Sequence, residues 1–202
     1  MTKARDVLID AVTRIREGVA STAGDLDEER LAHRPGPDAN SIGWLLWHLT
    51  RVEDAHVAEF LEDDQLYVVG GHAAALGLPE DPGDHGYGHT SALVAAVRIA
   101  DPAVLVAYHE AVADRTLEYL GTQSGKDLDR IVDENWDPPV TMGVRLVSIV
   151  DDDVQHAGHG TGGAAGGMGL GFGRRLRFWH RQRLPQISLA TYKYFTFNLQ
   201  VL

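Results

Sequence analysis

Apolar residues recur at intervals of three and four positions in four separate stretches of this 202-residue chain. This spacing places the apolar side chains along one face of an α-helix. The stretches cover residues 6–23, a segment that begins at residue 40 or 41, residues 101–120, and a segment that begins near residue 141. Because no convincing strand pattern accompanies them, the sequence predicts an all-α fold, a four-helix bundle with its site between the helices.

The second and third predicted helices are joined by a connection over residues 63–89 that is rich in Gly, Pro, Asp and His. This connection is too long for a simple link between packed helices, so we expect a long ordered loop with a functional role. Within it, Gly86-Tyr87-Gly88-His89 stands out because two glycines let the backbone turn sharply around two polar rings. Residues 25–31 are predicted to form a short capped turn.

The residue types of a metal site are divided between two of the predicted helices. His48 lies in the second one, and Asp152-x-x-x-His156 follows about a hundred residues later in the fourth. Residues four apart lie on the same face of a helix, so Asp152 and His156 could bind one ion together. His48 would complete a facial triad of two nitrogens and one oxygen. Such a set leaves coordination positions open, which is typical of a catalytic metal site.

Each of these side chains also has a plain structural interpretation. A histidine beside an apolar stripe, considered alone, is more often a hydrogen-bonded core residue than a ligand. Asp152 lies between Asp151 and Asp153, and acidic runs of this kind are usually solvated helix faces. The combination of spacing and separate helices favours the metal interpretation. His56 would lie roughly 12 Å from His48 along the helix axis, so we do not expect it to bind the same ion.

The composition excludes several classes of function. The chain contains no cysteine, so disulfides, thiolate ligands and a cysteine nucleophile are excluded, and any thiol chemistry must use a thiol that arrives as substrate. A formal charge of −11 argues against nucleic acid as a partner. Because there is neither an apolar run of about 18 residues nor a signal-peptide pattern, we expect a cytoplasmic protein that does not bind a membrane.

The charge is divided unevenly along the chain. Residues 1–159 carry all 29 acidic residues and 12 of the 18 basic ones, a formal charge of −17, whereas residues 160–202 carry the other six basic residues and no acidic residue. A glycine-rich run over residues 160–167 marks the break, and we expect the helix that carries His156 to fray there into a flexible linker. The sequence therefore predicts a bundle domain over residues 1–159 and a separate tail over residues 160–202.

The tail is basic and aromatic, with five arginines between residues 174 and 183. It could contact a membrane or nucleic acid, or pair with another chain. Its apolar spacing fits no single helical face, however. We favour the interpretation that the tail is not selected domain sequence, for example because of a shifted reading frame or read-through.

Four separated motifs carry a resemblance to a known family. They are the run over residues 34–54 with its core Trp44-Leu-Leu-Trp-His, the loop Gly86-Tyr-Gly-His, the turn Trp136-Asp-Pro-Pro-Val-Thr, and the run Val147-Ser-Ile-Val-Asp-Asp-Asp-Val-Gln-His-Ala-Gly. In this order they resemble the DinB/YfiT-like metal-dependent superfamily. Over residues 5–159 the chain is most similar to the actinobacterial mycothiol S-transferases, relatives of mycothiol-dependent maleylpyruvate isomerase.

The resemblance implies a four-helix bundle in up-down-down-up order that holds a divalent metal, usually zinc, nickel or a similar ion. One ligand comes from the second helix and a pair four residues apart comes from the last. These positions match His48, Asp152 and His156. The middle ligand is His or Glu in many relatives, and Asp is one methylene shorter than Glu. In relatives the last helix also continues several turns further and packs on the first, whereas here the glycine-rich run follows His159.

The function implied by the resemblance is a metal-dependent transferase that conjugates a low-molecular-weight thiol, mycothiol, to an electrophilic small molecule, as in detoxification. Zinc is the favoured ion, with nickel as an alternative. Besides the ligands His48, Asp152 and His156, we expect Arg51 or Tyr87 to orient the thiol or the substrate. Their structural alternatives are an ion pair with neighbouring acids for Arg51 and a surface turn for Tyr87.

Two other classes of function remain open. One is a metal-dependent hydrolase or isomerase of the same fold, in which the ion activates water or polarises a carbonyl. The other is a non-catalytic helical binding protein of the stress response. The sequence also leaves open whether the bundle forms a homodimer.

Overall fold

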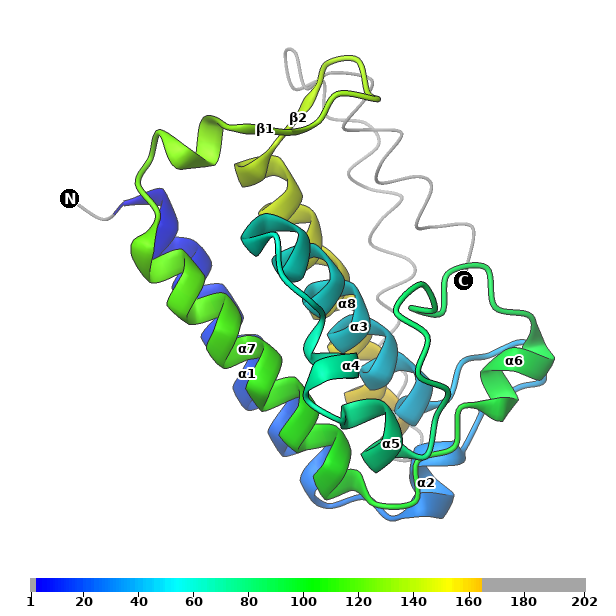
Figure 1. The fold of residues 1–202 in the computed structure, drawn as a ribbon. Helices are drawn as coiled ribbons and strands as arrows, with labels where there is room; N and C mark the ends of the chain where they lie inside the picture. The colour runs from blue at the N-terminus through cyan, green and yellow to red at the C-terminus, as the bar shows by residue number, and fades with distance from the viewer. Residues whose placement is uncertain (1–2, 165–202) are drawn as a thin grey trace, which may run out of the picture.

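The computed structural model describes residues 3–164, and four long helices dominate it (Figure 1). They are α1 (Ala4–Gly24), α3 (Ile42–Leu61), α7 (Pro102–Thr122) and α8 (Met142–Ala164). Two of them begin with a side-chain cap. The Ser41 side chain accepts a hydrogen bond from the backbone N–H of Trp44, and Asp101 caps α7 in the same way, with Pro102 in the first turn. The all-α prediction is confirmed.

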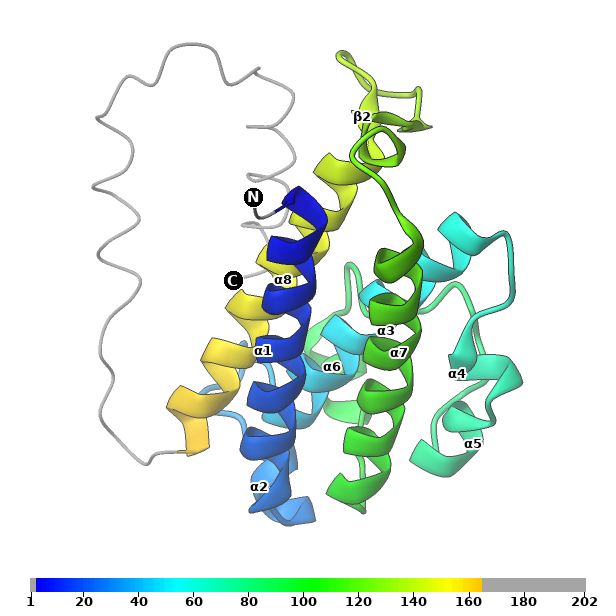
Figure 2. The same ribbon diagram turned by 90° about the vertical axis from the view of Figure 1, so that its left-hand side faces the viewer.

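The four long helices form a closed ring in which α1 packs on α7 and α8, and α3 packs on the same two helices. Contacts between helix ends give their directions. Arg5, at the start of α1, donates to the carbonyl of Gly121 at the end of α7, and Arg145, early in α8, donates to His56 late in α3. Thus α1 and α8 run in one direction and α3 and α7 in the other (Figure 2). The first half of α3 therefore faces the second half of α8.

The interior of the ring is filled by aliphatic and aromatic side chains in two adjoining clusters. The larger cluster joins α1 and α3 to the first half of α7, and the smaller one joins the start of α1 to the end of α7 and the start of α8. Each side chain removed from water contributes roughly 1.5–3 kcal/mol. The bundle core includes fully buried Val19, Leu46, Leu49, Leu105, Val112 and Leu120.

The predicted long loop over residues 63–89 is partly helical, so that prediction was wrong in detail. It contains α4 (Leu66–Val69) and α5 (His72–Leu76), which pack on α3 and α7. The physical reason is burial, because Tyr67 and Leu76 join the core. The Asp54 carboxylate accepts the backbone N–H groups of Leu66 and Tyr67, which fastens the start of α4 to α3.

Short elements complete the described chain. The predicted capped turn is α2 (Glu28–Ala32), where Asp27 accepts from the Arg30 N–H. A further helix, α6 (Ser91–Ala96), and the 3-10 turn η1 (Asp127–Asp129) precede and follow α7. Two short strands, β1 (Ile131–Asp133) and β2 (Val140–Thr141), pair antiparallel around the Pro138-Pro139 turn and leave the fold all-α. Strands of two and three residues are too short to give an alternating pattern.

Helix α8 does not end where the sequence predicts. It continues to Ala164, inside the glycine-rich run that was expected to fray. Once a helix has formed, each added residue gains one hydrogen bond, which offsets a glycine cost of about 1 kcal/mol. The predicted domain boundary at residue 160 stays a prediction, and residues 165–202 of the predicted tail lie outside the described residues. Among the described helices, none is long and apolar enough to cross a membrane.

A buried histidine lies in the bundle core, away from the predicted ligands. His109 of α7 is 1% exposed, and its Nδ1 lies 3.2 Å from the hydroxyl oxygen of Thr50 on α3. Burial lowers the pKa of His109 to about 4, and the charge of Arg16 acts in the same direction. The imidazole is therefore neutral at physiological pH.

Replacing a fully buried leucine of the ring should destabilise the fold without touching the predicted site. For Leu120→Ala we expect a loss of about 2–5 kcal/mol in the free energy of unfolding, since a cavity adds to the lost transfer energy. Leu93→Ala, at a side chain that is 49% exposed, is the matched control and should cost far less. Urea unfolding followed by circular dichroism measures both, and equal losses would contradict the described core.

The pH dependence of stability should carry a component from His109. The unfolded chain takes up a proton at this residue below its ordinary pKa of 6.5, whereas the folded protein does so only near 4. The contribution of His109 to the free energy of unfolding is therefore at its maximum above about pH 6.5. It falls by up to about 3 kcal/mol as the pH drops toward 4. His109→Gln removes this component, so the stability difference between the two proteins should shrink as the pH drops. Parallel curves would contradict the assignment.

Candidate metal centre

The first predicted ligand, His48, comes from the second turn of α3. The Ser41 cap starts the helix, and the apolar residues that follow bury this part of α3 against the rest of the bundle. His48 is 7% exposed, and its imidazole stacks on the Trp44 ring, with 4.7 Å between ring centroids and 11° between planes. The histidine is thereby held in one orientation at the α3–α8 contact.

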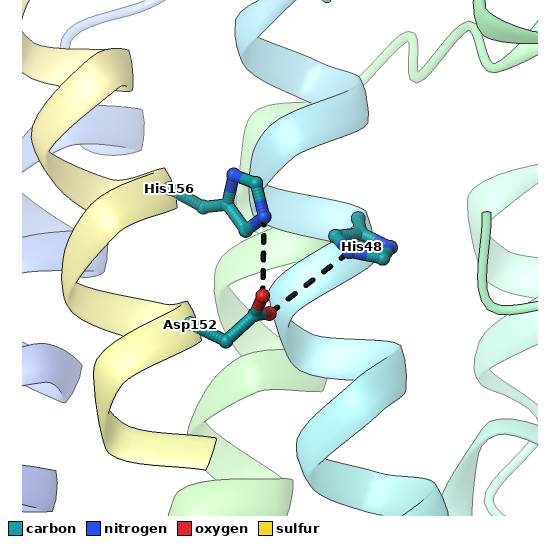
Figure 3. Close-up of side chains that lie close together, drawn as sticks. All are labelled: His48, Asp152 and His156. Atoms are coloured by element: carbon teal, nitrogen blue, oxygen red, sulfur yellow. Dashed lines mark ion pairs between the residues drawn. The ribbon is translucent and has the colours of Figure 1, made fainter. Parts of the chain in front are cut away.

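The other two predicted ligands lie one turn apart on α8 and face His48 (Figure 3). The Asp152 carboxylate oxygens lie 3.4 Å from His156 Nε2 and 3.9 Å from His48 Nε2. One donor atom from each of the three residues falls within 4.8 Å of the others. The structure thus brings together all three side chains that the sequence selects, from two helices that run in opposite directions.

The tautomer of His48 leaves its Nε2 available to a ligand. The Nδ1–H of the ring donates to the backbone carbonyl of His85, so the proton of the neutral imidazole lies on the side away from Asp152. A carbonyl partner of this kind orients the ring and makes the other nitrogen, Nε2, a stronger ligand for a metal. The Nε2 lone pair therefore points toward the Asp152 side of the site.

The charges of the site follow from burial and from the three neighbours. Burial lowers the pKa of His48 to about 4, although the negative charge of Asp152 opposes this shift. Burial also acts to raise the pKa of Asp152, but the hydrogen bond with His156 and the neighbouring imidazoles bring it below its ordinary value. At neutral pH the site thus offers a neutral imidazole and a carboxylate, the protonation states that bind a metal.

The donor set fits a divalent metal ion. Two imidazole nitrogens and one carboxylate oxygen suit zinc and nickel, and ligands of tetrahedral zinc lie about 3.4 Å apart at bond lengths near 2.1 Å. The separations of 3.4 and 3.9 Å around Asp152 are close to this value. In addition, Asp152 Oδ2 is buried without a hydrogen-bond partner. A buried carboxylate oxygen with no partner is costly, and a cation would satisfy it.

The loop over residues 84–89 covers the His48 side of the centre. Gly86 lies against α3 with a φ angle of +89°, and a Cβ atom there would come within 2.9–3.0 Å of Trp44, His48 and Trp47. Only glycine combines this backbone angle with such a close approach. The motif Gly86-Tyr-Gly-His therefore lies over the site, as the sequence suggests.

The two predicted substrate-orienting residues occupy very different positions. Arg51 is completely buried, and its guanidinium donates to the carbonyls of Asp84 and Pro82. The prediction that Arg51 contacts a substrate does not fit this enclosed position. Tyr87 is 47% exposed at the tip of the loop, with its ring centroid 6.4 Å from that of His85.

His56 is kept apart from the three ligands, as expected from its spacing. Its Nδ1 accepts a hydrogen bond from Arg145 and lies 3.6 Å from the Glu59 carboxylate. His89 is also bound elsewhere, with Nδ1 accepting from the Trp44 indole N–H and Nε2 lying 2.9 Å from the Asp84 carboxylate.

Sequence reasoning missed two contributors to the centre. One is the backbone carbonyl of His85, which has no signature in a sequence. The other is the Asp84 side chain, whose Oδ1 accepts from the Gly86 N–H and faces His89. The glycines that follow Asp84 could have indicated a tight loop with an Asx-type bond, since aspartate often binds the N–H two residues on.

The fold and the site together define a class: an all-α bundle with a candidate centre of two histidines and one aspartate between antiparallel helices. A family model described as Mycothiol-S-transferase matches residues 7–161, and the chain belongs to this family. Membership implies an enzyme of the mycothiol-related transferase type.

Among solved structures, the chain is similar to the crystal structure of a conserved protein from Enterococcus faecalis, with 28% identity and a TM-score of 0.74. The match covers 81% of this chain and 96% of that one. The comparison with curated proteins found no match.

The close approach at Gly86 can be separated from backbone strain by a paired substitution. Gly88 also has a positive φ, +73°, but nothing lies within 4 Å of a Cβ there. Gly86→Ala and Gly88→Ala should each cost about 1–2 kcal/mol of stability from the backbone alone. Only Gly86→Ala should also displace the loop from His48 and weaken zinc binding, by about tenfold or more. Equal zinc affinities in the two variants, measured by chelator competition, would contradict this description.

Proposed function

We propose that this protein is a divalent-metal-dependent transferase that conjugates a low-molecular-weight thiol, mycothiol, to an electrophilic small molecule. The observation that carries the proposal is the convergence of His48, Asp152 and His156 within 4.8 Å in a member of the mycothiol-S-transferase family. Because the chain has no cysteine, the sulfur nucleophile must be supplied by a second substrate.

The residues of the site support this chemistry in distinct ways. His48, Asp152 and His156 would hold the ion, for which zinc is the favoured identity and nickel the alternative. A bound divalent ion lowers the pKa of a coordinated thiol, so that the thiolate nucleophile is available near neutral pH. With His48, Asp152 and His156 as its protein ligands, the ion would have a position free for that thiol. Trp44 stacks on the His48 ring, and Gly86 of the loop over residues 84–89 packs against it, so both cover the His48 side of the site.

Tyr87 is the residue to which we assign a role in orienting the thiol or the electrophile. It follows by two positions the carbonyl that binds His48, and it is exposed enough to meet a substrate. A phenol can donate a hydrogen bond to an anionic group or accept one from a hydroxyl. Both kinds of group are available to a thiol co-substrate or its product.

The remaining properties of the protein agree with a small-molecule enzyme. A formal charge of −11 disfavours nucleic acid, and we place the reaction in the cytoplasm, where small thiols are kept reduced. Conjugation of an electrophile to a thiol in that compartment amounts to detoxification. Formation of a homodimer stays a prediction.

Removal of one ligand should abolish metal binding and activity together. For His156→Ala we expect loss of bound zinc and a fall of more than about 100-fold in the rate of mycothiol conjugation. Removing a partner that only orients a metal ligand costs about 10–100-fold, and removing the ligand itself should cost more. His33→Ala, at an exposed histidine outside the centre, is the matched control. The measurements are metal content by elemental analysis and thiol consumption with a model electrophile.

Full zinc content in His156→Ala would overturn the ligand assignment. Turnover that is independent of mycothiol and of other small thiols would instead favour the hydrolase or isomerase alternative. Purified protein without metal, whose melting temperature is unchanged by added zinc, would favour the non-catalytic binding protein.

A further inference from the structure

Three side chains on one face of α3 bind residues 81–89, which comprise the loop over residues 84–89 and the three residues before it. Trp44, His48 and Arg51 follow one another at intervals of four and three residues, which places them in one row. Each donates a hydrogen bond to the loop from its side-chain nitrogen. The central member of this row is the metal ligand, and its two neighbours hold the loop on either side of it.

The guanidinium of Arg51 is committed to the backbone of this loop. Nε donates to the carbonyl of Asp84 at 3.1 Å, and Nη2 lies 3.0 Å from the carbonyl of Pro82 and 3.4 Å from that of Asp81. A planar fork with several N–H groups can bind several acceptors at once, which a lysine cannot do. Arg51 thus fixes the path of the chain that leads into His85.

The charge of Arg51 is satisfied on the side facing the bundle core. Nη1 lies 3.6 Å from the Asp54 carboxylate and donates to the Tyr108 hydroxyl at 3.3 Å, and the guanidinium carbon lies 3.9 Å above the Tyr67 ring. The Tyr108 hydroxyl in turn donates to Asp54. These partners enclose the side chain completely, so its interactions are with the protein and not with a substrate.

The link from Arg51 to the metal ligand is one peptide unit long. The carbonyl of Asp84 accepts from Arg51, and the next carbonyl, that of His85, accepts from His48 Nδ1. Two consecutive carbonyls of the loop are therefore bound by two side chains of α3 that lie one turn apart. A loop released from Arg51 has no other described bond from α3 at Asp84 to hold the His85 carbonyl in place.

We propose that Arg51 is a positioning residue for the metal ligand His48. By holding the loop at residues 81–84, it keeps the His85 carbonyl against Nδ1 and thus keeps Nε2 unprotonated and directed at the centre. This inference rests on the proposed metal-dependent function, and it assigns Arg51 a role in place of substrate contact.

The decisive variant is Arg51→Lys, which keeps the positive charge beside Asp54 but removes the fork that binds the loop. We expect zinc affinity to fall by roughly 10–100-fold, the usual effect of losing a partner that orients a ligand. In the metal-free full-length protein, two-bond ¹H–¹⁵N spectra should show His48 with its proton on Nδ1. In Arg51→Lys the same ring, assigned by comparison with His48→Ala, should show a mixture of both tautomers.

The control separates positioning from loss of stability. Leu120→Ala lowers stability in another part of the bundle, so its zinc affinity should stay within about twofold of the wild-type value while its unfolding midpoint falls. A folded Arg51→Lys protein with wild-type zinc affinity and an unchanged His48 tautomer would overturn the inference. So would a wild-type protein whose His48 carries its proton on Nε2.

A second variant decides the matter if Arg51→Lys fails to fold. Asp84→Ala leaves Arg51 and its buried partners in place but removes the carboxylate that binds the Gly86 N–H and His89 in the same loop. Because Arg51 still binds the backbone carbonyls of the loop in this variant, we expect His48 to keep its proton on Nδ1. A mixed tautomer would show that the Asp84 carboxylate holds the loop instead, and it would overturn the inference. None of these measurements uses a thiol. A protein that binds zinc as described but does not conjugate mycothiol would therefore contradict the proposed function and leave the inference about Arg51 intact.

Discussion

The antiparallel packing of α3 against α8 is the contact on which the candidate centre depends. Because the helices run in opposite directions, the second turn of α3 meets the second half of α8, and His48 faces Asp152 and His156. The same pairing places Arg145 near the start of α8 beside His56 near the end of α3. Aliphatic and aromatic side chains fill the core beside this contact. The candidate ligands therefore lie on packed helices and not on loops.

Burial of polar groups along α3 and α8 is costly, and hydrogen bonds and ion pairs offset part of the cost. The Nδ1–H of His48 binds a loop carbonyl, and Arg51 is balanced by Asp54 and by the ring of Tyr67. Asp152 Oδ2 is buried with no hydrogen-bond partner, as are both carboxylate oxygens of Glu53 on α3 and Oδ1 of Asp153 on α8. An unsatisfied carboxylate oxygen opposite two imidazoles is the feature expected of a site that a cation completes.

The sequence predicted the four long helices well, because each one has a strong apolar period and two have clear caps at Ser41 and Asp101. The elements it missed are short. Helices α4 and α5 form only because Tyr67 and Leu76 find partners on α3 and α7, and the β1–β2 pair contains too few residues to show alternation. The extension of α8 to Ala164 was missed because glycine propensity was given more weight than helix propagation.

Some features of the candidate site were also predictable from the sequence, and others were not. The ligand residue types and the spacing of Asp152 and His156 are properties of the sequence, because a helical repeat places residues four apart on one face. His48 and the loop motif at Gly86 were selected from their residue types and positions in the sequence, and the family resemblance pointed to the same residues. For Arg51, however, residue type alone suggested contact with a substrate, whereas the structure encloses its guanidinium among loop carbonyls.

The sequence by itself thus determined the long helices, the family and the residue types of the three candidate ligands. Tertiary structure alone decided that the ligands converge, that the backbone of His85 selects the tautomer of His48, and that Arg51 faces the loop. The physical reason is that periodicity and propensity act between near neighbours in the chain. The distances among residues 48, 85 and 152 depend instead on how whole helices and their connections pack.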